Sequence, residues 1–374
     1  MWGSAAVAAG KGELSRGENK QTLVKELLVI LLVVGWLTPQ LTHSFTLFSL
    51  YWGSATGLAM AEVHRLIIEH GRERAREMVP AKQRHLVDMA AEVMAADQVA
   101  LNITYSGWCL TALPHKQIPD NEPWSRTGYN CTLIVEPGHL QVGSGKPRIF
   151  GVPYGARARL ILLYLQTEAV RNKSREVSLG RSMRDWMSRM GLSVGGETAK
   201  GLRDQAHRIA AANIKFFWKR DDNGSGMARG NIIESGLFFG SRQAAGQPLL
   251  FEDRVVLGET FYEDLLKRGV PLVDQAIKQL RDRSMSLDVY IWLAYKLHVL
   301  EERTPIRWQS LYSQFGAGFS VLKNFKPTFL DAMAAAIAAY PDAQVRTGDE
   351  GIVLLPSPPP IPYRTGQGPR RLAG

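Results

Sequence analysis

The residues of this sequence best suited to chemistry are four side chains on one predicted helix. Lys200, Arg203 and His207 follow the Gly195-Gly196 turn at spacings i, i+3 and i+7, and Arg208 lies beside them. Residues at these spacings share one face of a helix. Guanidinium and ammonium groups donate hydrogen bonds to phosphate oxygens and to base edges, and a helix fits the major groove of duplex DNA. The pattern therefore predicts contact with DNA rather than catalysis.

The elements that would position this helix are predicted on both sides of it. Residues 157–171 have the apolar period of a helix, and residues 175–180 are strand-like. Two short amphipathic helices follow, with inward positions Met183, Trp186, Met187 and Met190 in the first and Leu202, Ala206, Ile209 and Ala210 in the second. Residues 214–218 and 232–239 then predict a hairpin. Helix, strand, helix, turn, helix and hairpin is the order of a winged helix-turn-helix.

Positive charge is concentrated on the same stretch of the chain. The 374 residues carry a formal net charge of +10. Residues 151–220 contain fourteen Lys and Arg against five Asp and Glu, whereas residues 272–356 contain nine of each. A focused excess of this kind is typical of a surface that binds nucleic acid.

A second copy of the order follows the first. Residues 271–281, 287–300 and 306–315 predict helices, a further helix begins at Pro327 and ends at Tyr340, and residues 343–347 and 351–355 predict a hairpin. We therefore expect an α+β fold of tandem winged-helix domains with a small N-terminal extension of helices and strands. The expected parts are an N-terminal extension (1–59), a helical leader (60–97), a first winged-helix domain with a preceding β segment (98–250), a second winged-helix domain (251–355) and a disordered Pro-rich tail (356–374).

The expected DNA contacts come from both copies. The residues are Arg157, Arg159, Arg181, Arg184, Thr198, Lys200, Arg203, His207, Arg208, Lys215, Lys219, Arg220, Arg307, Lys323 and Lys326. His207 taken alone is also typical of a polar surface histidine. Only the last three residues lie near the second reading helix, so the neutral second copy either contacts DNA more weakly or serves mainly in assembly.

Sequence patterns of enzymes and metal sites do not occur. VGSGKP (142–147) lacks the glycine spacing and the Ser/Thr of a phosphate-binding loop. The chain has no His-x-His pair for a nicking enzyme and no carboxylate pair spaced for two-metal chemistry. Cys109 and Cys131 match neither a zinc site nor a disulfide framework, so we expect reduced, structural cysteines. We expect no catalytic residue, no metal and no cofactor.

The apolar run Leu27–Leu37 admits three interpretations. Its eleven residues are too few for a membrane span, which needs about 20. The segment is upstream sequence ahead of a start at Met60, a membrane tether or a signal peptide. We expect a cytoplasmic protein without a membrane partner, since export does not suit a protein that works on DNA.

Several long segments resemble the RepA family of bacterial plasmid replication initiators. They are WCLTALPHKQIPD (108–120), TLIVEPG (132–138), GVPYGARARLILLYLQTEAV (151–170), SREVSLGRSMRDWMSRMGLSVGG (174–196), IKFFW (214–218), FYEDLLKRGVPL (261–272), LDVYIWLAYKLH (287–298) and RWQSLYSQFG (307–316). The resemblance covers residues 60–356 and leaves out residues 1–59.

The resemblance implies a non-enzymatic initiator of plasmid replication. Such a protein binds repeated sequences (iterons) in the double-stranded plasmid origin, promotes origin opening, recruits the host replicative helicase or initiator proteins, and takes part in copy control. By analogy it exchanges between a homodimer and an origin-binding monomer, and it represses its own promoter. The alternative is a winged-helix transcriptional regulator without initiator activity.

Overall fold

The structure is a computed structural model, and it describes residues 62–96, 100–142, 145–219, 225–230, 232–236 and 253–361, with only the backbone described for 225–230. These residues all belong to one compact unit. The predictions for residues 1–59, for Arg220 and for residues 362–374 lie outside the described residues. Within them, the predicted mixture of helices and antiparallel strands is confirmed.

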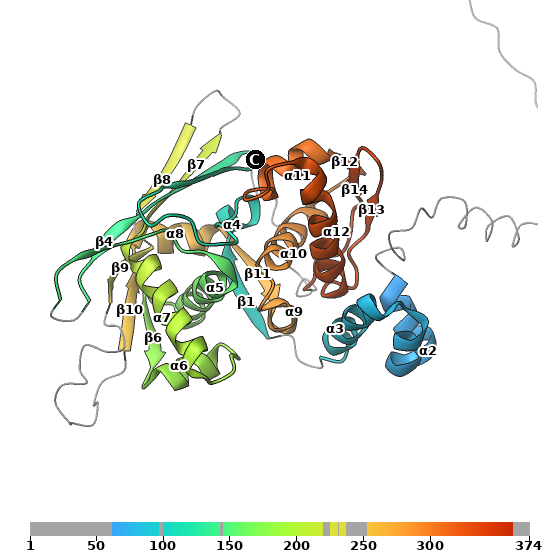
Figure 1. The fold of residues 1–374 in the computed structure, drawn as a ribbon, viewed down its shortest axis with the longest axis horizontal. Helices are drawn as coiled ribbons and strands as arrows, with labels where there is room; N and C mark the ends of the chain where they lie inside the picture. The colour runs from blue at the N-terminus through green and yellow to red at the C-terminus, as the bar shows by residue number, and fades with distance from the viewer. Residues whose placement is uncertain are drawn as a thin grey trace, which may run out of the picture. The chain divides into compact units, whose positions relative to one another are not determined.

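The first of two similar sets of elements surrounds the predicted helix-turn-helix (Figure 1). It comprises α5 (Gly155–Asn172), β6 (Glu176–Gly180), α6 (Met183–Arg189), α7 (Gly196–Ala211), β9 (Ile233–Gly236) and β10 (Asp253–Leu257). The three strands form an antiparallel sheet in the order β6-β10-β9. The last strand of the set therefore lies in the middle of its sheet. We call these elements the first repeat.

The second repeat has the same connectivity. It comprises α10 (Ser284–Lys296), β12 (Thr304–Arg307), α11 (Trp308–Phe315), α12 (Leu322–Ala338), β13 (Val345–Thr347) and β14 (Gly351–Leu354). Its sheet has the order β12-β14-β13, again with the last strand in the middle. The predicted recurrence of a helix pair followed by two strands is confirmed. The predicted helix 271–281 is wrong at its start, where Gly269–Val273 is a strand, and the strand β12 before α11 was not predicted.

The predicted hairpin of residues 214–218 with 232–239 is wrong. β7 (Asn213–Lys219) pairs instead with β8 (Ser225–Gly230) and with β3 (Cys131–Glu136), in a four-stranded sheet that β2 (Trp124–Thr127) completes. β9 pairs with β10 and not with β7. The predicted boundary between residues 250 and 251 would separate β10 from its own sheet, so the first repeat extends to Leu257.

The remaining elements connect or cover the two repeats. They are α2 (Glu62–Met78), η1 (Ala81–Gln83), α3 (Arg84–Met94), β1 (Leu101–Tyr105), α4 (Ser106–Leu110), β4 (Gly138–Leu140), β5 (Arg148–Phe150), α8 (Glu259–Arg268), β11 (Gly269–Val273), α9 (Asp274–Leu280) and η2 (Leu297–Val299). β1 pairs with β11, and β4 pairs with β5. The β4–β5 hairpin packs against α7, and α3 packs against α9 and α12.

Each repeat has its own hydrophobic core. The core of the first repeat includes Trp186 and Leu202 and continues into β3 and β7 of the four-stranded sheet. The core of the second repeat includes Phe325 and Phe329 and takes in α2 and α3. Complete burial of one large apolar side chain contributes about 1.5–3 kcal/mol, so the N-terminal helices are stabilised mainly by the second repeat.

Local predictions near the C-terminus need correction. α12 begins at Leu322 rather than at Pro327, and it ends at Ala338, because the fully buried Phe325 and Phe329 hold both sides of the proline in one helix. The first part of the tail is not disordered: the Ser357 N–H donates to the carbonyl oxygen of Leu297 at 3.2 Å, and the Tyr340 hydroxyl donates to that of Pro358 at 2.5 Å.

Both cysteines are buried and free, as predicted. Among the described residues, no helix is both long and apolar enough to span a bilayer. The described part of the chain also holds no group of three or more His, Cys, Asp or Glu side chains able to bind a metal ion.

A substitution at Gly138 tests how closely the β4–β5 hairpin must approach α7. A Cβ atom at position 138 would lie 1.9 Å from the carbonyl oxygen of Ala211. We expect Gly138→Ala to lower the free energy of unfolding by about 1–3 kcal/mol, the usual cost of overpacking, because backbone atoms must move apart. Urea denaturation followed by circular dichroism measures this change. Gly196→Ala is the control, since its Cβ would meet no atom within 4 Å; an equal loss in both variants would contradict the explanation.

Candidate nucleic-acid interface

The turn between α6 and α7 is defined by local hydrogen bonds. The Ser182 hydroxyl caps α6 by accepting from the backbone N–H of Asp185 at 3.1 Å. α6 is followed by Gly191, whose φ of 66° lies in the left-handed region that favours glycine. The Leu192 N–H then donates to the carbonyl oxygen of Met187 at 2.8 Å. Because Met187 is itself buried, the turn presents α7 at a fixed place on the core.

The two halves of α7 have different surroundings. In the first half Lys200 and Arg203 are exposed and Thr198 is half-buried. In the second half every residue from 205 to 209 is buried. β4 and β5 pack against this half, and the ring centroid of Phe150 lies 5.4 Å from that of His207. Only the N-terminal half of α7 is open to a ligand as large as a DNA duplex.

Arg157 of α5 joins the exposed half of α7. A Cβ atom built on Gly201 would lie 2.4 Å from Nη1 of Arg157, so the guanidinium lies directly against the glycine. The missing side chain at position 201 therefore allows Arg157 to cross the helix next to Lys200 and two residues from Arg203. We call Arg157, Lys200 and Arg203 the α7 basic surface. Among the described residues, none of the three forms an ion pair with a carboxylate.

The prediction that His207 and Arg208 share this exposed face is wrong. Arg208 is only 5% exposed. Its Nη1 lies 2.8 Å from Oδ1 of Asp120 and its Nε lies 2.9 Å from Oδ2 of Asp204, so its charge is neutralised inside the protein. His207 is 6% exposed, and burial lowers its pKa, with the charges of Arg148 and Arg203 acting in the same direction. Both side chains hold α7 to its neighbours.

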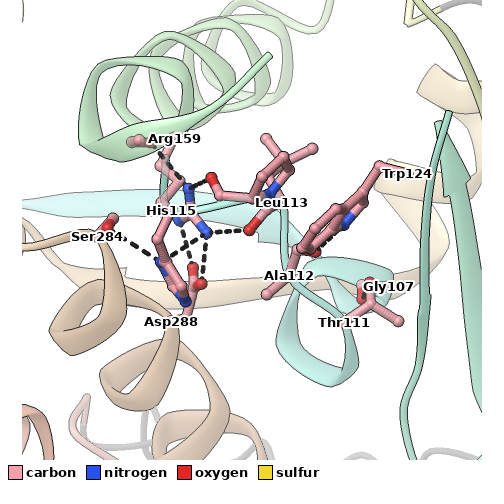
Figure 2. Close-up of polar contacts among 11 residues, drawn as sticks. Gly107, Thr111, Ala112, Leu113, His115, Trp124, Arg159, Ser284 and Asp288 are labelled. Atoms are coloured by element: carbon pink, nitrogen blue, oxygen red, sulfur yellow. Dashed lines mark hydrogen bonds and ion pairs between the residues drawn. The ribbon is translucent and has the colours of Figure 1, made fainter. Parts of the chain in front are cut away.

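Arg159 is also buried, contrary to its predicted place among the DNA contacts (Figure 2). Its Nε and Nη2 donate to the two carboxylate oxygens of Asp288 in α10, each at 2.6 Å. Nη2 also donates to the carbonyl oxygen of Leu113 at 2.7 Å, and Nη1 donates to that of Gly155 at 2.8 Å. The bidentate pair links the first helix of one repeat to the first helix of the other.

The half-buried His115 contacts this group as a neutral side chain. Its Nδ1 lies 3.0 Å from the hydroxyl oxygen of Ser284 and 3.5 Å from Nη2 of Arg159, as Figure 2 shows. Burial lowers the pKa of His115 to about 3, and the charges of Arg159 and Arg126 contribute to the shift. Since both neighbours can donate, the unprotonated Nδ1 acts as their acceptor.

The remaining predicted residues are dispersed over other elements. Arg181 and Arg184 are exposed at the start of α6. Lys219 is exposed at the end of β7, and Nζ of Lys215 lies 2.7 Å from Oε2 of Glu136. In the second repeat Arg307 and Lys323 are exposed, and Nζ of Lys326 lies 5.2 Å from the ring centroid of Trp308. The structure thus does not bring the predicted residues that it describes into one surface.

Arg148 is a basic residue near α7 that the sequence reasoning missed. Its guanidinium carbon lies 4.6 Å from the ring centroid of Phe150, and it is exposed. The available signal was the alternation of side chains through HLQVGSGKPRIF (139–150), which is typical of a hairpin. That signal predicts strands but not that they pack against α7.

Comparison with known proteins supports the resemblance seen in the sequence. Residues 152–310 match the model of a family described as plasmid encoded RepA protein, which confirms the resemblance over that segment. Two crystal structures of domains 2 and 3 of RctB align with this chain at 12% sequence identity and a TM-score of 0.41. The first covers 61% of this chain and 82% of its own, and the second covers 66% and 93%. No curated protein matches the chain.

Removing one partner of the buried Arg159–Asp288 ion pair should cause a large loss of stability. Asp288→Asn leaves the Arg159 charge uncompensated, and we expect a loss of about 3–5 kcal/mol in the free energy of unfolding. The double variant Arg159→Met/Asp288→Leu should lose less stability than the sum of the losses of Arg159→Met and Asp288→Leu, because it leaves no buried charge. Urea denaturation measures all of these changes. Glu77→Gln, in the exposed Arg74–Glu77 pair, is the control and should leave the midpoint unchanged; an Asp288→Asn midpoint equal to that control would contradict the role of the pair.

His115 predicts a loss of stability on acidification. The unfolded imidazole takes up a proton below its ordinary pKa of 6.5, whereas the folded one does so only near a pKa of about 3. The unfolded state therefore binds more protons between these values, and stability falls as pH falls through that window. Between pH 7 and pH 5 the contribution is up to about 2 kcal/mol. His115→Asn, whose amide oxygen can replace Nδ1 as acceptor, should lose correspondingly less stability over the same pH range in urea titrations; an unchanged pH dependence would rule out this assignment.

Proposed function

We propose that this protein initiates plasmid replication by binding repeated sequences in the double-stranded origin, and that α7 reads those sequences. The observation that carries the proposal is the α7 basic surface. Arg157, Lys200 and Arg203 converge on the open half of the second helix of a helix-turn-helix, without a carboxylate partner among the described residues. Nothing inside the described protein balances this charge, whereas DNA phosphates would.

The connectivity of both repeats supports winged-helix domains. In each, a helix and a strand precede the two helices of the helix-turn-helix, and two strands follow, the last lying in the middle of the sheet. In this arrangement the wing is the connection between the last two strands. In the first repeat the last two strands are β9 and β10, so the β7–β8 hairpin, which belongs to another sheet, is not its wing. In the second repeat the wing is the turn between β13 and β14.

The chemistry of the α7 basic surface fits duplex DNA. The N-terminal half of a helix can enter the major groove, where Lys200 and Arg203 would reach base edges or phosphates. Arg157 projects from a neighbouring helix and would contact the phosphate backbone, which fixes orientation rather than sequence. The half-buried Thr198 hydroxyl is a further donor. The buried Arg159, His207 and Arg208 leave the set of proposed contacts, because their side chains hold the protein together.

The second repeat has a different part in the proposal. Its helix α12 begins with Lys323 exposed, Lys326 lies over the ring of Trp308, and Arg307 is exposed on β12. With no net charge over residues 272–356, this repeat would bind DNA more weakly or serve in assembly. The match of residues 152–310 to the plasmid encoded RepA family supports the initiator role. We further propose host helicase or initiator proteins and a second copy of the chain as partners.

The proposal predicts specific and salt-sensitive DNA binding. The full chain should bind a duplex carrying direct repeats from beside its own gene more tightly than a random duplex of equal length. Affinity should fall steeply as salt rises, because phosphate contacts release counterions. Fluorescence anisotropy at several salt concentrations measures both effects. Equal affinity for the two duplexes at moderate salt would contradict specific reading. Repression of its own promoter without replication of a plasmid that carries the repeats would favour the transcriptional regulator instead.

The variant Lys200→Ala/Arg203→Ala tests whether α7 is the reading helix. We expect at least about a tenfold loss of affinity for the repeat duplex and loss of plasmid maintenance, since each contact to a base or phosphate contributes about 1–3 kcal/mol. Arg74→Ala/Lys82→Ala removes the same charge from exposed positions on α2 and η1, and should leave both properties intact. Normal plasmid maintenance by the α7 variant would show that another element reads the origin.

A further inference from the structure

The β4–β5 hairpin carries a second arginine to the exposed half of α7. We propose that Arg148 of β5 and Arg203 of α7 together bind one backbone phosphate of the DNA duplex that α7 reads. This inference rests on the proposed function and adds an element outside the segment that matches the RepA family. The hairpin would thus be a DNA-binding element as well as a cover for α7.

The register of the hairpin sets the position of Arg148. Gly138 pairs with Phe150, and Leu140 pairs with Arg148, so all four residues lie on the same face of the hairpin. Gly138 closely approaches Ala211 near the end of α7, and the Phe150 ring contacts that of His207. The face that carries Arg148 is therefore the face packed on α7. Arg148 is two pairs further out than Phe150 in this register and lies at the edge of the packing.

Arg203 reaches the same place from the helix. It lies four residues before His207, so the two side chains share a face of α7, with Arg203 one turn nearer the open end. The charges of Arg148 and Arg203 both act on the buried His207 imidazole. The guanidinium of Arg148 lies over the Phe150 ring that contacts His207, and Arg203 lies one turn from His207 on α7, so both charges lie near the same imidazole.

The charges around Arg148 and Arg203 favour the binding of an anion. Both arginines are exposed, and no described carboxylate forms an ion pair with either of them. The nearby carboxylates of Asp120 and Asp204 are already paired with Arg208. Two adjacent cations repel each other unless a shared anion lies between them, and guanidinium groups bind phosphate oxygens with two parallel hydrogen bonds. The proximity of the reading half of α7 makes a phosphodiester of the same duplex the fitting ligand.

Salt-dependent DNA binding by the full chain tests the shared phosphate. Arg148→Met keeps an apolar stem over Phe150 and removes the charge, and Arg203→Met is its counterpart on α7. Each variant should bind about tenfold more weakly to both the repeat duplex and a random duplex, because a phosphate contact carries no sequence information. Each should reduce the slope of log Kd against log salt by less than about 0.9, the value for one phosphate, because the remaining arginine still neutralises the shared phosphate. The double variant should reduce that slope by about 0.9 in total, since only one phosphate contact is lost.

Controls separate the possible outcomes. Arg74→Met removes an equal charge on α2 and should bind like the wild type. Arg148→Lys keeps the charge, so its slope of log Kd against log salt should be close to that of the wild type. This variant tests the charge of Arg148 even if thermal unfolding shows that Arg148→Met folds poorly. If Arg148→Met binds DNA as tightly as the wild type while Arg203→Met binds more weakly, this inference is overturned and the proposed function still holds. A slope reduced by about 1.8 in the double variant, the value for two separate phosphates, would overturn the shared phosphate. Absence of salt-dependent binding by the wild type would instead refute the proposed function.

Discussion

The arrangement of the two repeats depends on the buried ion pair between Arg159 and Asp288. Each side chain is 6% exposed, and two charges so far from water are stable only while they remain together. The pair joins α5 to α10, the first helix of each repeat. Because each of these helices packs in the core of its own repeat, the contact also restricts where α7 and α12 can lie relative to one another. A residue that looked suited to bind DNA thus helps to align the two repeats, together with Leu160 and Leu163 of α5, which pack in the core of the second repeat.

The basic residues of α7 likewise fall into two groups: those that stabilise the fold and those that are available to a ligand. The helix has one continuous apolar face, but its outer face is covered by β4 and β5 over the second half only. Arg208 in the covered half is neutralised by Asp120 and Asp204. Arg203, one turn earlier, has no such partner among the described residues. Since burial requires an internal counter-charge, an arginine without one is the better candidate for an external anion.

The two repeats share their connectivity and differ in what surrounds it. Between α7 and β9 the first repeat contains β7 and β8, which build a sheet with β2 and β3, whereas α12 is followed directly by β13. The basic residues are gathered around the first repeat, and the N-terminal helices α2 and α3 pack on the second. In the proposed function the first repeat reads the DNA, and the second binds DNA more weakly or serves in assembly.

The sequence by itself determined most of the helices, though not α4 or α8, and it determined the recurrence of their order and their buried apolar faces. Trp186, Leu202 and Ile209 are buried as their spacing predicts, because helical period depends only on local geometry. The tertiary structure decided which strands pair and which cations stay exposed. Residues 214–218 alternate in a way that suits any partner strand, so their pairing with β3 depends on contacts distant in sequence. Likewise, Arg203 and Arg208 are alike in the sequence, and only the packing of β4 and β5, with Asp120 beside them, makes one a surface cation and the other part of the core.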